Sequence, residues 1–184
     1  MKIALIQMRS GTDVQANVKS ALKAIKTAAA EGAEFIATPE MTHLLQKDAD
    51  DLRTKVSLER DDPAVKAFAS MAQEFGVHIL AGSLAIKKSR GKKIANRSYL
   101  FSTYGEITAT YDKINLFEAA ISDKETYKES DTYAAGESVV IAPVGDLQLG
   151  LSICYDVRFP AHYKSFAQAE ADMIAVPAAF TTAT

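Results

Sequence analysis

Short apolar runs alternate with amphipathic segments along this chain. Residues 2–7 and 34–38 are brief apolar runs that predict buried strands. Between them, residues 14–29 carry apolar side chains at helical spacing, with Asp13 as a candidate N-cap and Gly32 as the stop. A strand, a helix and a second strand in this order predict a parallel strand pair with a helix on one face.

The alternation continues through the middle of the chain. Residues 44–62 are polar and acidic and predict a long excursion. Pro63 then opens a second amphipathic helix, which Gly76 ends. Three β-prone runs follow, at residues 77–86, 94–102 and 107–113. The basic run at residues 87–93 lies between two of them and predicts a solvated hairpin loop.

The last third contains one long stretch without periodicity. Residues 118–137 predict a loop of a length that is more often functional than idle. Residues 139–144 and 147–154 flank a Gly-Asp turn and predict a hairpin. A helical segment at residues 160–171 and a short apolar strand at 173–176 complete the pattern. Alternating strands and helices of this kind predict a layered α/β fold.

Composition narrows the class of protein. The chain has 184 residues, 48% of them hydrophobic, and we treat residues 1–184 as one domain. A net charge of −2 gives no indication of binding to nucleic acid or to an anionic membrane. No run approaches the roughly 20 apolar residues of a membrane-spanning helix, and no signal peptide is visible. One free cysteine suits a reducing compartment, so we expect a cytoplasmic protein.

The only cysteine, Cys154, stands where an apolar run meets a sudden polar break. A lone cysteine forms neither an internal disulfide nor a cysteine-based metal site, so it is either a packed small hydrophobe or a nucleophile. Taken alone, packing is the simpler interpretation. Two distant residues change that balance, because Glu40 and Lys113 also follow apolar or β-prone runs. In isolation Glu40 would be a turn cap and Lys113 a surface lysine.

The three surrounding segments, in their order, resemble the nitrilase superfamily, the carbon–nitrogen hydrolases. They read FIATPEM at residues 35–41, YDKINLF at 111–117 and CYDVRFP at 154–160. The resemblance covers the whole chain and implies an α-β-β-α sandwich with two central sheets. It is greatest to the branch that contains deaminated glutathione amidase. An ω-amidase is the first alternative, and a carbamoyl-amine hydrolase or a true nitrilase is a further one.

The resemblance implies a Glu–Lys–Cys site that hydrolyses a small carboxylate-bearing amide. Cys154 would attack the carbonyl carbon and form a thioester, with Glu40 carrying the proton. Lys113 and the backbone N–H of Tyr155 would stabilise the oxyanion. Such a reaction involves no cofactor and no metal. A pairing of Cys154 with a histidine, of which His162 is nearest in sequence, has no other support.

Two more residues are candidates for the site. Glu129, in the run YKES, resembles a second glutamate of the family and would orient Lys113 or place water. Its alternative is a solvated loop glutamate. Arg158 would bind a substrate carboxylate, since a guanidinium fork matches that group in bidentate fashion. Its alternative is a structural ion pair with Asp156.

Some features depart from the family pattern. Asn115 and Glu118 replace a histidine and an aspartate that related sequences often have, and we expect them to alter the pocket shape only. Family members usually continue well beyond the last residue of this chain. We therefore expect a truncated member whose last strand is incompletely covered and which forms a homo-oligomer. The non-enzymatic alternative is an inactive remnant without a competent pocket.

Overall fold

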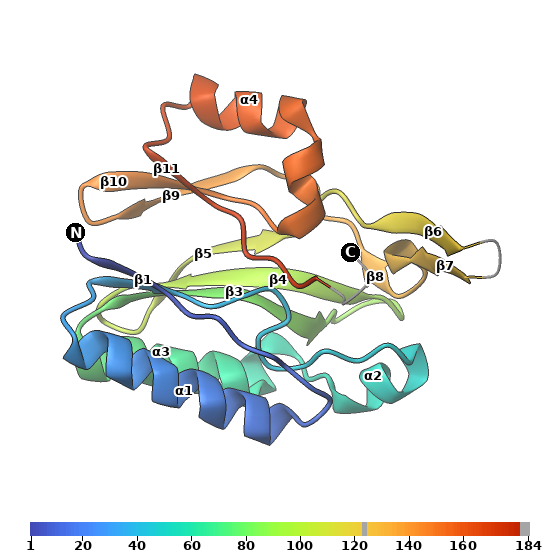
Figure 1. The fold of residues 1–184 in the computed structure, drawn as a ribbon, viewed down its shortest axis with the longest axis horizontal. Helices are drawn as coiled ribbons and strands as arrows, with labels where there is room; N and C mark the ends of the chain where they lie inside the picture. Colours follow the sequence, from blue (N-terminus) through green and yellow to red (C-terminus); the bar gives the residue numbers. More distant parts are fainter. Residues whose placement is uncertain (123–124, 181–184) are drawn as a thin grey trace.

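Two β-sheets face each other, and helices cover the outer face of each sheet (Figure 1). The computed structural model describes residues 1–122 and 125–180. α1 (Val14–Ala30) and α3 (Pro63–Phe75) lie under the larger sheet, and α4 (Pro160–Gln168) lies over the smaller one. This arrangement confirms the α-β-β-α sandwich that the resemblance implied.

The larger sheet has the order β1-β2-β3-β4-β5, with β8 paired to β4. The β1-β2-β3 part is parallel, which confirms the expected strand–helix–strand unit, and the β3-β4-β5 part is antiparallel. The strands are β1 (Ile3–Leu5), β2 (Phe35–Ala37), β3 (His78–Lys87), β4 (Ile94–Phe101), β5 (Ile107–Asp112) and β8 (Tyr133–Ala134).

The smaller sheet has the order β11-β10-β9. β9 and β10 form the expected antiparallel hairpin, and β11 pairs with β10 in parallel. Their bounds are β9 (Val140–Val144), β10 (Leu147–Leu151) and β11 (Met173–Ala175). Glycine at position 150 permits α4 to pack closely on this sheet, because a Cβ there would lie 2.8 Å from the Phe166 ring.

Local signals in the sequence fix the helix ends. The Asp13 side chain caps α1 by accepting a hydrogen bond from the Ala16 N–H at 3.0 Å. Asp62 caps α3 by accepting from the Ala64 N–H at 2.9 Å. Gly76 ends α3 in the left-handed conformation, with φ of 62°.

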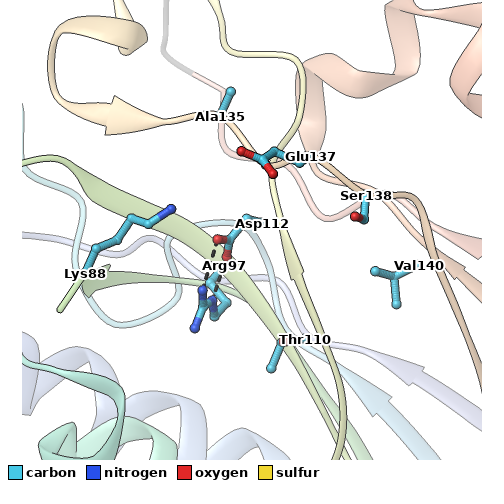
Figure 2. Close-up of a pocket in the computed structure, with 9 residues that line it drawn as sticks. Lys88, Arg97, Thr110, Asp112, Ala135, Glu137, Ser138 and Val140 are labelled. Carbon is cyan, nitrogen blue, oxygen red and sulfur yellow. Dashed lines mark hydrogen bonds and ion pairs between the residues drawn. The ribbon is translucent and has the colours of Figure 1, made fainter. Parts of the chain in front are cut away.

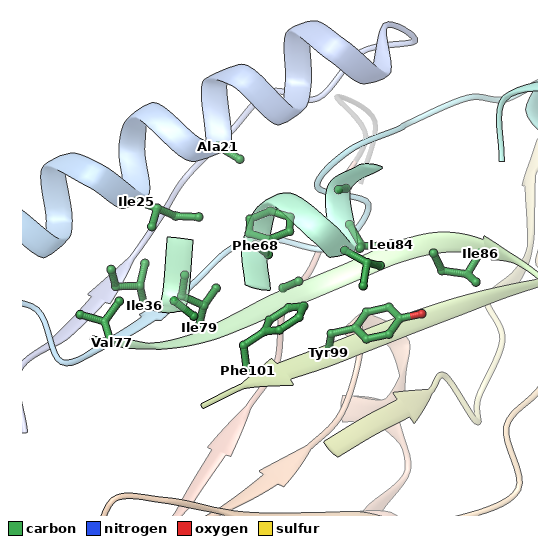
Figure 3. Close-up of a cluster of buried hydrophobic side chains, with 14 of the residues drawn as sticks. Ala21, Ile25, Ile36, Phe68, Val77, Ile79, Leu84, Ile86, Tyr99 and Phe101 are labelled. Atoms are coloured by element: carbon green, nitrogen blue, oxygen red, sulfur yellow. The ribbon is translucent and has the colours of Figure 1, made fainter. Parts of the chain in front are cut away.

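Two apolar cores hold the layers together. Between the helices and the larger sheet, Ile25, Phe68 and Ile79 are fully buried (Figure 3). Between the two sheets, Leu100 and Leu149 are equally buried. The central strands are thus covered on both faces, which explains their continuous apolar runs.

Several short elements lie where the sequence predicted none, and the expected loop at 118–137 was wrong. The excursion at 44–62 contains α2 (Ala49–Lys55) and the 3₁₀ turn η1 (Glu59–Asp61). The expected loop at 118–137 contains a hairpin, β6 (Glu118–Ser122) and β7 (Glu125–Lys128), then η2 (Glu129–Asp131) and β8. These segments lack helical or alternating apolar periodicity, so the pattern gave no sign of them.

The first strand also differs from expectation. β1 was expected to be buried, but Leu5 is 80% exposed and Ile3 42% exposed. β1 is an edge strand of the larger sheet. Its apolar composition predicted burial wrongly, because burial also depends on whether other elements cover the strand. Of the described helices, none has the length and apolar character needed to cross a bilayer.

Candidate active site

Glu40 lies in a turn that follows β2 and is held by an irregular part of β3. The Met41 N–H donates to Ser83 Oγ at 2.9 Å, and the Gly82 N–H donates to Thr38 Oγ1 at 3.1 Å. Both β3 residues lie where the β3–β4 register shifts, between Ala81 and Leu84. The bulge therefore turns backbone and side-chain groups toward the Glu40 segment.

Lys113, just beyond β5, extends its ammonium between two carboxylates. Lys113 Nζ lies 3.0 Å from Glu40 Oε1 and 2.9 Å from Glu129 Oε2. All three side chains are buried, with exposed fractions of 2%, 6% and 4% respectively. The alternatives of a surface lysine and a solvated loop glutamate are therefore wrong.

Asn96, which the sequence analysis missed, joins the same cluster from β4. Its Nδ2 lies 3.0 Å from Glu40 Oε1 and 3.1 Å from Glu129 Oε1. Its backbone carbonyl accepts a hydrogen bond from the Lys113 N–H at 2.9 Å. An asparagine inside an apolar strand was the available signal, because a buried amide requires polar partners.

Cys154 begins the 3₁₀ turn η3 (Cys154–Arg158), three residues after β10 ends. Its φ of 47° is unusual for a residue that is not glycine. The Cys154 N–H donates to the Pro177 carbonyl at 2.9 Å, so the segment after β11 holds the turn in place. Sharp, strained turns of this kind aim a side chain in a direction that a regular strand does not.

Asp156, a second residue whose role the sequence analysis missed, anchors this turn from within. Its fully buried carboxylate accepts hydrogen bonds from Tyr111 Oη at 2.7 Å, the Ile153 N–H at 2.8 Å and Asn115 Nδ2 at 2.9 Å. The Asn115 backbone N–H also donates to it, at 2.8 Å. Asn115, expected to alter the pocket shape, thus ties the Lys113 segment to the Cys154 turn.

The segments that follow β2, β5 and β10 carry Glu40, Lys113 and Cys154, and they meet in one partly buried site. The Ala179 N–H donates to Glu40 Oε2 at 3.0 Å. Burial, the nearby Glu40 charge and a hydrogen bond to Glu40 raise the pKa of the Cys154 thiol to about 12, although Lys113 and the Ala179 N–H act in the opposite direction. At neutral pH the sulfur therefore carries its proton and has a carboxylate beside it to receive that proton.

The Lys113 ammonium is held in its charged form. Burial by itself lowers the pKa of a lysine, but the Glu40 and Glu129 carboxylates outweigh it and raise the pKa of Lys113 above its ordinary value. The cluster thus contains one permanent cation among groups able to accept and return a proton.

Tyr155 and Arg158 lie on the same turn as Cys154. The Tyr155 ring is half-buried and makes edge-to-face contacts with Phe117 at 5.1 Å and Phe159 at 5.5 Å between ring centroids. The Arg158 side chain is exposed. Within the described part of the chain it forms no ion pair with Asp156, so that alternative is wrong.

His162 does not pair with the cysteine. Its ring packs at a tilt against Phe166, with 4.9 Å between the ring centroids, and its Nδ1 lies 3.9 Å from an Asp156 oxygen. Residues 1–122 and 125–180 contain no group of three histidine, cysteine, aspartate or glutamate side chains suited to a metal ion.

A polar hollow of about 290 Å³ lies along β5, away from the cluster (Figure 2). Arg97 and Asp112 form a bidentate ion pair in it, at 2.6 and 3.0 Å, and Arg97 also binds Glu59 at 2.8 Å. Arg97 follows Asn96 in sequence and Asp112 precedes Lys113. Because side chains alternate along a strand, this ion pair faces the opposite side of the sheet from the cluster.

Comparison with known proteins gives consistent matches over the whole chain. A family model described as carbon–nitrogen hydrolase matches residues 2–183. A deaminated glutathione amidase from Yersinia enterocolitica is 37% identical, with 99% of this chain and 64% of that protein covered. The chloroplastic omega-amidase of Arabidopsis thaliana is 30% identical, with 99% and 50% covered.

Solved structures agree with the sequence matches. The Caenorhabditis elegans NitFhit protein superposes with a TM-score of 0.87 at 28% identity, with 97% of this chain and 44% of that chain covered. This chain spans between half and about two thirds of the length of the two curated relatives described above.

Proposed function

Because this chain belongs to the carbon–nitrogen hydrolase family, we propose that it hydrolyses a small carboxylate-bearing amide through a thioester on Cys154. One observation carries the proposal: a buried lysine lies within 3.0 Å of two carboxylates, one of which is beside the only thiol. A nucleophile, a proton carrier and a fixed cation are the groups that amide hydrolysis requires.

The first half-reaction forms the acyl-enzyme. Glu40 takes the thiol proton as Cys154 Sγ attacks the carbonyl carbon, because a thiol with a pKa near 12 is not ionised in advance. The carbonyl oxygen becomes an oxyanion in the tetrahedral intermediate. As the C–N bond breaks, Glu40 returns the proton to the leaving nitrogen, and ammonia or an amine departs.

The second half-reaction regenerates the thiol. Glu40 removes a proton from a water molecule, whose oxygen attacks the thioester carbonyl. The C–S bond breaks, the carboxylic acid product leaves and Cys154 recovers its proton. Glu129 supports both steps by holding Lys113, from which it is 2.9 Å distant.

Two donors are assigned to the oxyanion. Lys113 is a cation at neutral pH, since its carboxylate partners raise its pKa. The backbone N–H of Tyr155 follows the nucleophile directly, and no described hydrogen bond occupies it. One such donor typically contributes about 3 kcal/mol to transition-state stabilisation.

We propose a deaminated glutathione amidase-like specificity, with ω-amidase or carbamoyl-amine hydrolase activity as alternatives. The relatives named deaminated glutathione amidase and omega-amidase support the first two. Arg158 is exposed beside the cysteine turn, where its guanidinium is available to a substrate carboxylate.

The decisive experiment measures ammonia or amine release from deaminated glutathione, succinamate and an N-carbamoyl amino acid. We expect turnover of the first two substrates, and loss of turnover in Cys154→Ala. Glu40→Gln and Lys113→Met should each lower kcat/KM by about a hundredfold or more. A folded Cys154→Ala protein that hydrolyses amides near the parent rate would refute the assignment. A folded parent without any turnover would favour the inactive remnant.

We further propose a single-domain, cytoplasmic homo-oligomer. Leu5 and Phe180 are 80% and 76% exposed, and apolar side chains of this size on a surface favour association. Within the described residues, β1 and β11 each leave one strand edge unpaired. Light scattering coupled to size exclusion gives the mass, and a monomer at micromolar concentration would contradict this proposal.

A further inference from the structure

Asn96 divides the hydrogens of one amide group between two carboxylates. Its Nδ2 lies 3.0 Å from Glu40 Oε1 and 3.1 Å from Glu129 Oε1, in a site closed to solvent. Lys113 contacts the same Glu40 oxygen, Oε1, at 3.0 Å. One oxygen of Glu40 thus receives two donors from the larger sheet.

The other oxygen of Glu40 is contacted by the segment that follows β11, not by the larger sheet. Glu40 Oε2 accepts only the Ala179 N–H among the described hydrogen bonds, at 3.0 Å. The same N–H lowers the pKa of the Cys154 thiol, so it also lies close to the sulfur. Oε2 and the thiol therefore share the Ala179 N–H as a neighbour.

We propose that Asn96 is a positioning residue that fixes Glu40 Oε1 and so reserves Oε2 as the oxygen that exchanges the proton with Cys154. This inference rests on the proposed function of Glu40 as the proton carrier. It goes beyond that function because it assigns different tasks to the two oxygens of one carboxylate and names the group that separates them.

Charge explains why an amide suits this position. Lys113 supplies one positive charge against the two carboxylates, so the buried cluster has a carboxylate in excess. Two neighbouring carboxylates repel each other unless hydrogen-bond donors lie between them. An amide donates to both carboxylates without changing the charge.

The surrounding groups allow only one orientation of the Asn96 side-chain amide. Asn96 Oδ1 is buried and has no hydrogen-bond partner among the described residues. Turning the amide over would place this oxygen against two carboxylate oxygens and lose both donors. The two glutamates alone therefore decide which way the side chain faces.

The test replaces Asn96 by residues that remove its donors in different ways. Asn96→Asp has the same shape but adds a third carboxylate, and Asn96→Leu removes the donors without adding charge. Asn96→Ser keeps one donor. Thr108→Val is the matched control, because Thr108 on β5 donates to the Leu100 carbonyl at 3.2 Å and contacts neither carboxylate.

Two readouts are used. The first is the pH profile of kcat/KM for succinamate. We expect its acid-side midpoint to move up by about one pH unit or more in Asn96→Asp, less in Asn96→Leu, and not at all in Thr108→Val. The second is the rate at which iodoacetamide alkylates Cys154, the only thiol, at pH 7. We expect this rate to fall roughly tenfold in Asn96→Asp, because Glu40 Oε2 is no longer held in place to accept the thiol proton.

The two readouts separate the possible failures. If the parent does not hydrolyse succinamate or deaminated glutathione, the proposed function fails, while alkylation still tests the role of Asn96. Unchanged alkylation in Asn96→Asp and Asn96→Leu overturns the inference even if the parent is active. Faster alkylation also overturns it, since a merely structural residue would expose the thiol when removed. If Asn96→Asp does not fold, Asn96→Leu and Asn96→Ser decide the question by the same criteria.

Discussion

Lys113 shows how a single buried residue depends on its neighbours. An isolated ammonium in a protein interior would lose its charge or unfold the site, because desolvation disfavours ions. Here two carboxylates compensate it, at 3.0 and 2.9 Å. Removing one partner of such a cluster is costly, since the others are left buried and unpaired.

Arg158 is the residue whose contribution concerns the substrate rather than the fold. Its side chain is exposed and makes no described ion pair, so Arg158→Ala should leave the stability of the protein unchanged. We expect KM for succinamate to rise roughly tenfold or more, because the carboxylate loses a charge-assisted partner. KM for a neutral amide of similar size, such as butyramide, should change little.

The matched control for Arg158 is Lys26→Ala. Lys26 is an exposed cation on α1, in the helix layer beneath the larger sheet. Lys26→Ala removes one positive charge, as Arg158→Ala does, but it leaves the cysteine turn unaltered. Equal KM increases for succinamate and butyramide in Arg158→Ala would show that Arg158 does not recognise the carboxylate.

At the scale of elements, the bulge of β3 connects the sheet to the site. Gly82 lies in this bulge, and a Cβ at that position would be 2.0 Å from the Thr38 carbonyl oxygen and 2.6 Å from that of Pro39. Both neighbours are backbone atoms of the turn that carries Glu40. The absence of a side chain therefore permits the close approach of β3 to this turn.

We expect Gly82→Ala to damage activity and stability together. The added methyl would push the Thr38–Glu40 turn away from β3 and displace the Glu40 carboxylate, lowering kcat/KM by about a hundredfold. Urea unfolding should show a loss of about 1–3 kcal/mol, the usual scale for overpacking. Gly11→Ala is the control, because a Cβ at Gly11 has no heavy atom within 4 Å. Equal behaviour of the two variants would disprove this explanation.

At the scale of the whole molecule, His43 joins three elements. It follows the Glu40 turn, its carbonyl accepts a hydrogen bond from Asn17 Nδ2 on α1 at 2.9 Å, and its ring lies 3.9 Å from Asp62 at the start of α3. Burial lowers the pKa of His43 to about 4. The folded protein therefore keeps this imidazole neutral at a pH where the unfolded chain has already protonated it.

This difference predicts acid sensitivity. The unfolded chain binds the extra proton between about pH 6.5 and 4, so the free energy of unfolding should fall as pH falls through that range. The loss attributable to His43 is at most about 3 kcal/mol. Burial raises the pKa of Asp62, which acts in the opposite direction at the acid end of the range.

The measurement is urea unfolding of the parent and of His43→Leu from pH 7 to pH 4. We expect the variant to lose less stability over this range than the parent, whatever its stability at pH 7. Parallel curves for the two proteins would show that His43 is not the group responsible.

The sequence by itself determined the features that depend on neighbouring residues. Helix periodicity, the Asp13 and Asp62 caps and the Gly76 stop are local, because each uses contacts within a few residues along the chain. The placement of Glu40, Lys113 and Cys154 after strand-like runs was equally readable. Motif resemblance then supplied the sandwich, which periodicity alone did not indicate.

Only the tertiary structure decided how distant segments meet. Lys113 lies 73 residues from Glu40 and Ala179 lies 139 residues from it, and no local preference encodes such contacts. The roles of Asn96 and Asp156 likewise became clear only from contacts between distant segments. The function of a buried polar group depends on the partners that hydrogen-bond to it. β1 was misjudged for the corresponding reason: an apolar strand is buried only where other elements cover it, and at the sheet edge Leu5 remains exposed.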